Sequence, residues 1–408
     1  MKPLNKIFHQ LSNADFNKEY AKRKSFDSTK VFDLTIKPID QSETFSLYYV
    51  PTAEMISTIE QIYEYDKELE NIFENLPDVA KEQFIIESVA EELYNTNDLE
   101  GIRSSKAELV ESTRDAFSHK KTNKRFTSMI KSYAKLVNKD IEAPATPGDI
   151  RNIYDYIASE EVAVKEQLDG KLFRKEVTHI LKKSGTGKII HRGLIDEDNI
   201  ITHLEKLLAF MDKGNHQVPK LIKVAIGHYY FGYIHPFYDG NGRTSRFISS
   251  VYLSEFLFYL TAISLSRASN NYINDYLDAF EITNSIKSRG ELNFFIETFL
   301  GLIIKGQIDV LSEIKEKQAL LEAAIRKIQT EDYFKDKDDH YKSMVFILAQ
   351  NHFFSNEKGM TAKELSEILA FSDSTARKIL NELTDAAILQ KNGLRPVYYS
   401  PAISYFEN

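Results

Sequence analysis

Hydrophobic side chains recur every three to four positions along most of the chain, and this spacing predicts amphipathic helices. The periodic segments are MISTIEQIYEYDKELENIF, KEQFIIESVAEELY, SMIKSYAKLV, GDIRNIYDYI, NIITHLEKLLAFMDK and KLIKVAIGHYYFGYI. We expect the asparagines within residues 95–97 to end the second of these helices, and Thr146, Pro147 and Asp149 to start the fourth. The pattern therefore predicts a mainly α-helical protein.

Stretches rich in strand-forming residues are few. FSLYYV, before residue 51, predicts a short strand, while EVTHIL and KIIHRG, joined by KKSGTG, predict a β-hairpin over about residues 175–193. Near the C-terminus, LQKNGLRPVYYS predicts two strands joined at Asn392-Gly393, a dipeptide typical of tight hairpin turns.

The order of these elements divides the chain into three expected domains. Residues 1–145 form an N-terminal helical region, residues 146–330 a helical core with the β-hairpin, and residues 338–408 a C-terminal domain. The charged segment 326–340 lacks apolar periodicity and predicts a linker. In the last domain, a helix, a helix-turn-helix and a strand pair follow one another, which is the order of a winged helix. A length of 408 residues suits two or three domains.

Composition narrows the class of protein. Hydrophobic residues make up 42% and charged residues 27%, the balance of a globular protein with sizeable cores. The net charge of −8 argues against bulk attraction to nucleic acid or to an anionic membrane. The absence of cysteine excludes disulfides and fits a cytoplasmic location, and the N-terminus lacks the apolar segment of a signal peptide. Glu255 and several serines interrupt the apolar run over residues 246–266, which predicts a buried core helix and no membrane partner.

The winged helix raises DNA as a candidate partner. Its expected recognition helix carries Arg377 and Lys378, and its wing carries Lys391 and Arg395. Over residues 360–396, however, five basic residues are balanced by five acidic ones, which is a weak electrostatic footprint for DNA. Contact with another protein, or formation of a homodimer, is the alternative use of this domain.

The segment HPFYDGNGRTSR concentrates several kinds of chemistry in a short stretch. Gly240, Asn241 and Gly242 accept positive backbone dihedrals, so their successive N–H groups can face one concavity. The helical periodicity that follows places this concavity at a helix N-terminus, where an anion is favoured. Arg243 and Arg246 lie on the first turn of that helix and can donate to phosphate oxygens. The segment therefore predicts a site for a polyphosphate.

Asp239 and His235 add two further functions to this predicted site. A carboxylate beside polyphosphate oxygens is a common way to hold Mg²⁺, so Asp239 is the expected metal ligand. His235, which precedes the loop, can take a proton from an attacking hydroxyl at neutral pH. A base, a metal ligand and a phosphate site together are the parts of a phosphoryl or nucleotidyl transfer.

HPFYDGNGRTSR resembles the signature of the Fic family at each defining position, and the resemblance covers about residues 150–305. It implies a small helical bundle that moves AMP from ATP to a Ser, Thr or Tyr hydroxyl of another protein and releases pyrophosphate. His235 would then be the catalytic base, and Asp239 would hold Mg²⁺. The glycine–asparagine–glycine loop would hold the phosphates of ATP, and the two arginines would clamp them.

Three further positions bear on the nucleotide. Relatives that transfer the terminal phosphate instead carry a lysine where Gly242 stands, so glycine favours AMP transfer. Tyr272 matches a tyrosine that relatives place beside the adenine, with core packing as the equal alternative. An asparagine that some relatives carry seven residues later is replaced by Ala279, which leaves the contacts to the base open.

A second segment resembles the inhibitory motif of the family, in which Ser or Thr is followed after three residues by Glu and then Gly or Asn. Here the motif runs from Thr96 to Gly101, within a helix expected over about residues 80–105. The resemblance implies that Glu100 pairs with Arg246, which the terminal phosphate of ATP also needs, so that ATP cannot bind productively. Members of this subclass also use this glutamate to remove AMP, and both directions stay open. A helix end capped by Thr96 and Glu100 is the alternative interpretation.

The predicted β-hairpin resembles the flap of the family, on which an extended segment of a target protein would dock by strand pairing. His179 and His191 lie on its two strands. A metal site is one interpretation of this pair, and ordinary surface histidines are the favoured one.

Two other functional classes compete with an enzyme. A transcriptional regulator that only senses a nucleotide would need no base, so His235 argues against it. A toxin would take its inhibitory glutamate from a partner protein, and Glu100 within the chain makes that partner unnecessary. The sequence therefore predicts a protein adenylyltransferase that inhibits itself.

Overall fold

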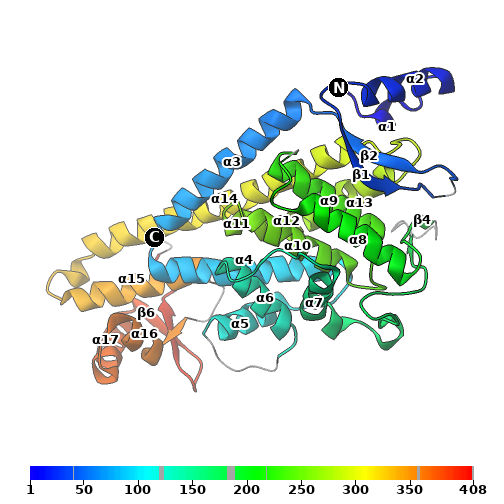
Figure 1. The fold of residues 1–408 in the computed structure, drawn as a ribbon. Helices are drawn as coiled ribbons and strands as arrows, with labels where there is room; N and C mark the ends of the chain where they lie inside the picture. Colours follow the sequence, from blue (N-terminus) through cyan, green and yellow to red (C-terminus); the bar gives the residue numbers. More distant parts are fainter. Residues whose placement is uncertain (40, 119–123, 182–188, 217, 356–358, 407–408) are drawn as a thin grey trace. The chain divides into compact units, whose positions relative to one another are not determined.

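The computed structural model describes residues 1–39, 41–118, 124–181, 189–216, 218–355 and 359–406. The chain divides into two compact units. Unit 1 comprises Met1–Lys67 and Val89–Ile308, and unit 2 comprises Glu68–Ser88 and Asp309–Asn408. Three long helices contribute residues to both units: α3 (Ala53–Glu74), α4 (Asp78–Leu99) and α14 (Asn293–Thr330) (Figure 1).

Unit 1 is mainly helical. Its other helices are α1 (Leu4–Ile7), α2 (Asn13–Lys24), α5 (Lys106–Phe117), α6 (Thr127–Val137), α7 (Pro147–Ile157), α8 (Glu197–Met211), α9 (Lys220–Ile234), α10 (Asn241–Ser254), α11 (Tyr259–Ala262), α12 (Leu265–Asn271) and α13 (Ile273–Thr283). Short 3-10 turns lie at Ser159–Glu161 and Val164–Glu166. The helices predicted from periodicity before residue 235 are present, and Thr146 forms the expected capping box with Asp149.

Two antiparallel strand pairs belong to the described part of unit 1. β1 (Lys30–Ile36) pairs with β2 (Phe45–Tyr49), which is the strand predicted at FSLYYV; its partner β1 was not predicted. β3 (His179–Leu181) pairs with β4 (Ile189–Arg192), where the hairpin was predicted. Its connection, KKSGTG, lies outside the described residues.

The centre of unit 1 is formed by α9 and α10, which are buried along almost their whole lengths. α10 packs against α9, α7 and α11, and α8 packs against the other side of α9 (Figure 1). A helix that is covered on all sides carries its polar side chains into the interior, where each of them needs a partner. This constraint applies to His228 on α9 and to Arg243 and Arg246 on α10, which are all buried.

The helix predicted to end at residues 95–97 continues to Leu99, so that prediction is wrong. Asn95 lies within the last turns of α4 and is almost completely buried. Its side-chain amide donates to the carbonyl oxygen of Glu91 at 2.8 Å, and its amide oxygen accepts from Asn270 of α12 at 3.0 Å. These contacts outweigh the modest helix propensity of asparagine, which was the basis of the prediction.

The glycine after α4 sets the true end of the helix. Gly101 has a φ of +74° and donates its N–H to Asp98 O at 3.0 Å, while Ile102 donates to Asn97 O at 2.9 Å. This pair of hydrogen bonds is the Schellman motif, which needs a left-handed residue at the position of the glycine. The motif fixes the direction in which Glu100, the preceding residue, leaves the helix.

The apolar run over residues 246–266 does not form the single core helix that we expected. α10 ends at Ser254, and a second helix, α11, begins at Tyr259. The carboxylate of Asp66 accepts the N–H of Phe258 at 3.0 Å and the hydroxyl hydrogen of Thr261 at 2.7 Å, so it caps the start of α11 from a distant part of the chain. No helix in the described part of the chain is both long enough and apolar enough to cross a bilayer.

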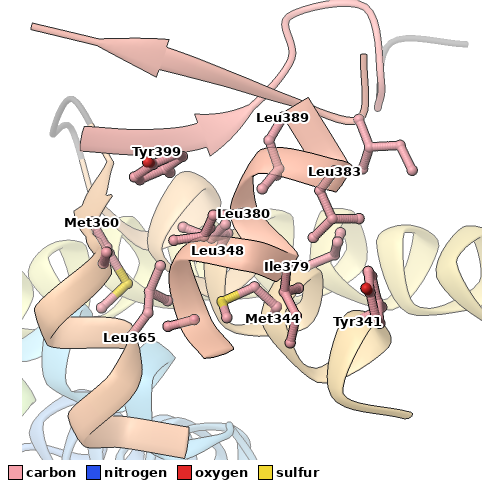
Figure 2. Close-up of a cluster of buried hydrophobic side chains, with 14 of the residues drawn as sticks. Tyr341, Met344, Leu348, Met360, Leu365, Ile379, Leu380, Leu383, Leu389 and Tyr399 are labelled. Carbon is pink, nitrogen blue, oxygen red and sulfur yellow. The ribbon is translucent and has the colours of Figure 1, made fainter. Parts of the chain in front are cut away.

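Unit 2 has a hydrophobic core of its own. Its helices are α15 (Asp339–Phe354), α16 (Ala362–Leu369) and α17 (Asp373–Asp385), and its sheet has the order β5 (Met360–Thr361), β7 (Tyr398–Pro401), β6 (Leu389–Asn392). Figure 2 shows side chains such as Met344, Leu348, Leu380 and Leu383 packed between these helices and the sheet. The helices and the strands β6 and β7 lie where the sequence predicted them, whereas β5 was not predicted, and the classification as a winged helix stays a prediction.

Two details of unit 2 differ from expectation. Ile328 of α14 and Phe334 of a 3-10 turn (Asp332–Phe334) are buried in this core, so the charged segment 326–340 is packed and is not a solvated linker. The connection between β6 and β7 spans residues 393–397 and is not a two-residue turn. Pro396 has no N–H to donate to the ladder, so the second strand begins only after it. The expected domain boundary at residue 338 stays a prediction.

Candidate active site

Two residues with left-handed backbones shape the loop between α9 and α10. His235 ends α9 with a φ of +53°, and Gly240 precedes α10 with a φ of +77°. Asn241 closes the loop, because its side chain donates to Phe237 O at 2.7 Å and accepts from Phe237 N at 3.0 Å. The ring of Phe237 stacks on Tyr154 of α7 with 3.8 Å between centroids. The loop is therefore fixed by hydrogen bonds within it and by packing beneath it.

Arg174 holds the backbone of His235 in place, although nothing in the sequence pattern singled it out. The side chain is fully buried, with Nε donating to His235 O at 2.9 Å and Nη2 to Ile234 O at 3.4 Å. Nη1 donates to Glu176 O at 2.6 Å, and the backbone N–H of Arg174 donates to Pro236 O at 3.3 Å. The guanidinium thus satisfies the carbonyl groups at the end of α9, which have no partner within the helix.

The imidazole of His235 is neutral at physiological pH. Burial lowers its pKa to about 3, and the neighbouring His191 and Arg174 lower it further by disfavouring a second positive charge. The backbone of Gly232 partly offsets this effect, and the neutral ring keeps one unprotonated nitrogen that can accept a proton. The ring is therefore held in the protonation state that a general base requires.

Arg243 is a buried cation that lacks a full set of partners. Its Nη2 lies 3.6 Å from the carboxylate of Asp239, and its Nη1 donates to Ala158 O at 3.5 Å. Within the described residues, Nε and Nη2 make no hydrogen bond although the side chain is fully buried. Buried donors without acceptors are costly, so this guanidinium fits an anion bound at the N-terminus of α10.

Arg246 is also buried, and here the partners come from α4. Nη2 donates to Glu100 Oε1 at 3.0 Å and to Thr96 O at 3.1 Å, while Nε donates to Thr96 Oγ1 at 3.0 Å. Burial by itself lowers the pKa of Arg246, but the charge of Glu100 and the contact with Tyr276 raise it above its usual value. Glu100 and Thr96, which lie far from Arg246 in the sequence, are thus brought onto it as the inhibitory motif implied.

The carboxylate of Glu100 packs directly against the backbone of Gly242. A Cβ atom at this position would lie 2.1 Å from Glu100 Oε1 and 2.8 Å from Arg246 Nη1, both far inside van der Waals contact. No side chain at position 242 is compatible with the observed placement of Glu100. A side chain at position 242 would therefore displace the Glu100 carboxylate from Arg246.

A cavity of about 240 Å³ opens beside these residues. Its lining includes Glu100, His235, Asp239, the loop Gly240–Gly242 and Arg246. The opposite walls come from elements that the motif does not contain, namely Ile180 and Ile190 of the strand pair β3–β4 and Tyr276, Leu277, Phe280, Glu281 and Asn284 of α13 and its end. The resemblance pointed to this region through Tyr272 and position 279, but nothing in the sequence singled out the five residues of α13 and its end that line the cavity.

Three predicted site residues, Tyr272, Arg243 and Thr96, do not line this cavity, and His191 has a structural role. Tyr272 is not among the lining residues; it is 37% exposed, and Lys305 Nζ lies 3.7 Å from its ring centroid. Arg243 faces Asp239 beside the cavity but does not line it. His191 is buried and its Nε2 lies 2.7 Å from Tyr233 O, whereas His179 is exposed, so the two do not form a metal pair.

The residues around Asp239 fit a divalent cation only if a polyphosphate is bound as well. In the described part of the chain, no group of three or more His, Asp or Glu side chains is placed to hold a metal. Asp239 is 37% exposed at its side chain, and one carboxylate oxygen accepts the N–H of Gly240 at 2.6 Å. One carboxylate together with phosphate oxygens is the usual arrangement for Mg²⁺. Asp239 fits that arrangement.

The contacts of Arg174 generate a stability prediction. Arg174→Ala should lower the free energy of unfolding by about 2 kcal/mol, because it leaves the carbonyl group of His235 without a donor and removes one of the two donors to Ile234 O. Lys175→Ala removes an exposed positive charge from the adjacent position and should change stability little. Urea titrations followed by circular dichroism measure both. Equal midpoints for the two variants would show that Arg174 does not support the loop.

The comparison with known proteins agrees with this geometry. Residues 144–253, which include α7, α9, the loop and most of α10, match the family model described as Fic/DOC family. A crystal structure of a Fic family protein from Desulfovibrio desulfuricans G20 aligns with 87% of this chain and 98% of its own, at a TM-score of 0.51 and 17% identity.

Two further solved structures are more distant. A Fic domain containing signaling protein from Bacteroides thetaiotaomicron VPI-5482 aligns with 64% of this chain and 97% of its own at 19% identity and a TM-score of 0.43. Fic-1 from C. elegans aligns with 64% of this chain and 74% of its own at 15% identity and a TM-score of 0.40. Residues 144–253 of this chain are thus similar to the Fic/DOC family, and the chain shares its fold with the Desulfovibrio protein.

Proposed function

We propose that this protein is an adenylyltransferase that moves AMP from ATP to a Ser, Thr or Tyr hydroxyl of a target protein. One observation carries the proposal: a neutral histidine, a helix N-terminus and a buried arginine face one cavity. The family match adds the reaction class, because Fic domains commonly transfer AMP to proteins. A regulator that only senses a nucleotide has no use for a neutral base in this position.

The reaction follows from these positions. The target hydroxyl oxygen attacks the α-phosphorus of ATP and forms a new P–O bond, while the bond to the β-phosphate oxygen breaks and pyrophosphate leaves. The hydroxyl proton passes to the unprotonated ring nitrogen of His235. The N–H groups at the start of α10, with Arg243 and Arg246, stabilise the charge on the phosphates. Mg²⁺, when bound at Asp239, supplies further neutralisation of that charge.

The strand pair β3–β4 serves as the docking site for the target. It forms a two-stranded sheet in the described residues, with Ile180 and Ile190 lining the cavity. An extended segment of a target protein that pairs with one of these strands lies along the cavity, and its hydroxyl then reaches His235. The hydrogen bonds of such pairing involve only backbone, so targets of different sequence are acceptable.

Glu100 keeps the resting protein inactive by occupying Arg246. A guanidinium donates in a fixed fork, and donors that are engaged by a carboxylate are not free for a phosphate. ATP therefore binds without its terminal phosphate on Arg246, and its α-phosphate is not aligned with His235. Removal of AMP from a modified target belongs to the same proposal, with Glu100 orienting the attacking water.

The role of His235 leads to a test of the chemistry. His235→Ala should reduce transfer of labelled AMP to target proteins by about 10²–10⁴-fold while ATP binding changes little, because other residues hold the phosphates. His203→Ala, on α8 and away from the cavity, is the matched control. Transfer at the wild-type rate by the His235 variant would remove this residue from the mechanism.

The metal requirement is tested at Asp239. In excess EDTA the transfer of AMP should fall by about a hundredfold or more, and Asp239→Ala should show the same loss in the presence of Mg²⁺. The control is Asp198→Ala, which removes an exposed carboxylate at the start of α8. If transfer continues undiminished in EDTA, the protein does not use a divalent cation for this step.

Inhibition by Glu100 predicts opposite effects at the two ends of one ion pair. Glu100→Gly should raise AMP transfer about tenfold or more, because Arg246 becomes available to the nucleotide. Arg246→Ala should lower transfer, and the double variant should behave like Arg246→Ala, since the clamp is then absent in both. Glu108→Ala, an exposed acidic residue on α5, is the control. Equal incorporation by wild type and Glu100→Gly, at matched protein and ATP, contradicts autoinhibition.

A further inference from the structure

A buried chain of polar side chains runs from Arg246 into the core of unit 1. The hydroxyl of Tyr276 on α13 interacts favourably with the Arg246 guanidinium, with which it lines the same cavity, and lies 2.9 Å from His228 Nε2. His228 Nδ1 lies 2.8 Å from Ser249 Oγ and 3.1 Å from Ser245 Oγ. These polar side chains thus join the three helices α9, α10 and α13. Of the residues in the chain, the family motif contains only Ser245 and Arg246.

The two ends of this chain imply the same direction for its hydrogen bonds, from Arg246 through Tyr276 and His228 to Ser249. Arg246 can only donate, so the Tyr276 oxygen accepts and its hydrogen goes to His228 Nε2. At the other end, Ser249 uses its own hydrogen on Ser245 O at 2.9 Å, so Ser249 Oγ accepts from His228 Nδ1. Both ends assign the neutral tautomer of His228 with the hydrogen on Nδ1. Phenylalanines of α13 and α14 pack around the ring of His228, and burial lowers its pKa to about 3. The ring is therefore uncharged.

This chain differs from the other contacts of Arg246 because it does not involve α4. Tyr276, His228 and Ser249 are 6%, 2% and 2% exposed, so water does not substitute for them. The contacts from Thr96 and Glu100 depend on the position of the inhibitory helix, whereas those of Tyr276 depend only on α9, α10 and α13. The guanidinium therefore keeps one fixed partner whether or not Glu100 is in place.

We propose that Tyr276 and His228 are positioning residues that hold the Arg246 guanidinium in the orientation needed to bind the terminal phosphate of the nucleotide after Glu100 has left. The inference rests on the proposed function, since it concerns the clamp that ATP and Glu100 share. His228 acts through Tyr276, which it orients by accepting the hydroxyl hydrogen. Neither residue exchanges a proton in the reaction. Preorganisation of this kind lowers the cost of ordering a long side chain on binding.

The test measures the affinity for ATP against that for ADP in the Glu100→Gly protein, by calorimetry with Mg²⁺ present. Arg246 is assigned to the terminal phosphate of ATP, so ADP serves as the ligand that lacks this contact. Tyr276→Phe and His228→Leu should each weaken ATP binding about tenfold and leave ADP binding nearly unchanged. His228→Gln, which retains an acceptor for the Tyr276 hydroxyl, should restore most of the affinity for ATP.

Two further variants separate positioning from general support of the fold. On the Arg246→Ala background, Tyr276→Phe should add no further loss, because the group that it positions is gone. Tyr252→Phe, which removes a buried hydroxyl on α10 bonded to Pro144 O at 3.2 Å, should not change the preference for ATP over ADP. Melting temperatures of all variants show that loss of selectivity does not follow loss of stability.

Different results would overturn the positioning role and the proposed function. Equal losses for ATP and ADP, no loss with Tyr276→Phe, or no binding of ATP by the Glu100→Gly protein overturns the positioning role. If selectivity for ATP follows the chain as described but no AMP is transferred by the protein with His235 intact, the proposed enzymatic function fails while the positioning role stands.

Discussion

The site is organised around one buried positive charge. Arg246 is 1% exposed, and a guanidinium removed from water is tolerated only where acceptors surround it. The observed acceptors are Thr96, Glu100 and Tyr276. Glu100 supplies the negative charge, but it sits at the C-terminal end of α4, where the helix dipole disfavours an anion. An incoming phosphate can provide the same compensation without that penalty, which makes the pair suited to exchange.

The second constraint is the backbone of the loop. His235 adopts a left-handed conformation that is unfavourable for a residue with a side chain, and it persists because Arg174 bonds the carbonyl groups on both sides of the α-carbon. The same guanidinium adds a positive charge near the imidazole and helps to keep it neutral. Support of the loop and preparation of the base are thus achieved by one side chain.

The pair of Glu100 and Arg246 also places a limit on position 242. A Cβ atom there would lie 2.1 Å from Glu100 Oε1, so any side chain at this position must displace the Glu100 carboxylate.

The sequence by itself determined those parts of the site that lie together in the chain. The segment from His235 to Arg246 was predicted because a helix end, a glycine loop and a helix start are local features, as are the periodic helices and the capping box at Thr146. The tertiary structure decided what depends on distant residues. It extended α4 past Asn95 through contacts with α12, and it divided the apolar run after Arg246 with a cap from Asp66.

The partners of the predicted site residues belong to this second group. Arg174, Tyr276 and His228 lie outside the motif, and no periodicity or spacing marks them, because each acts on a residue that only the fold brings near. Tyr272, which local resemblance suggested, lies outside the cavity that Tyr276 lines one helical turn later. Tyrosines four residues apart lie on the same face of a helix, so the sequence pattern does not distinguish Tyr272 from Tyr276. Only the packing of α13 against α9 and α10 determines which of the two faces the site.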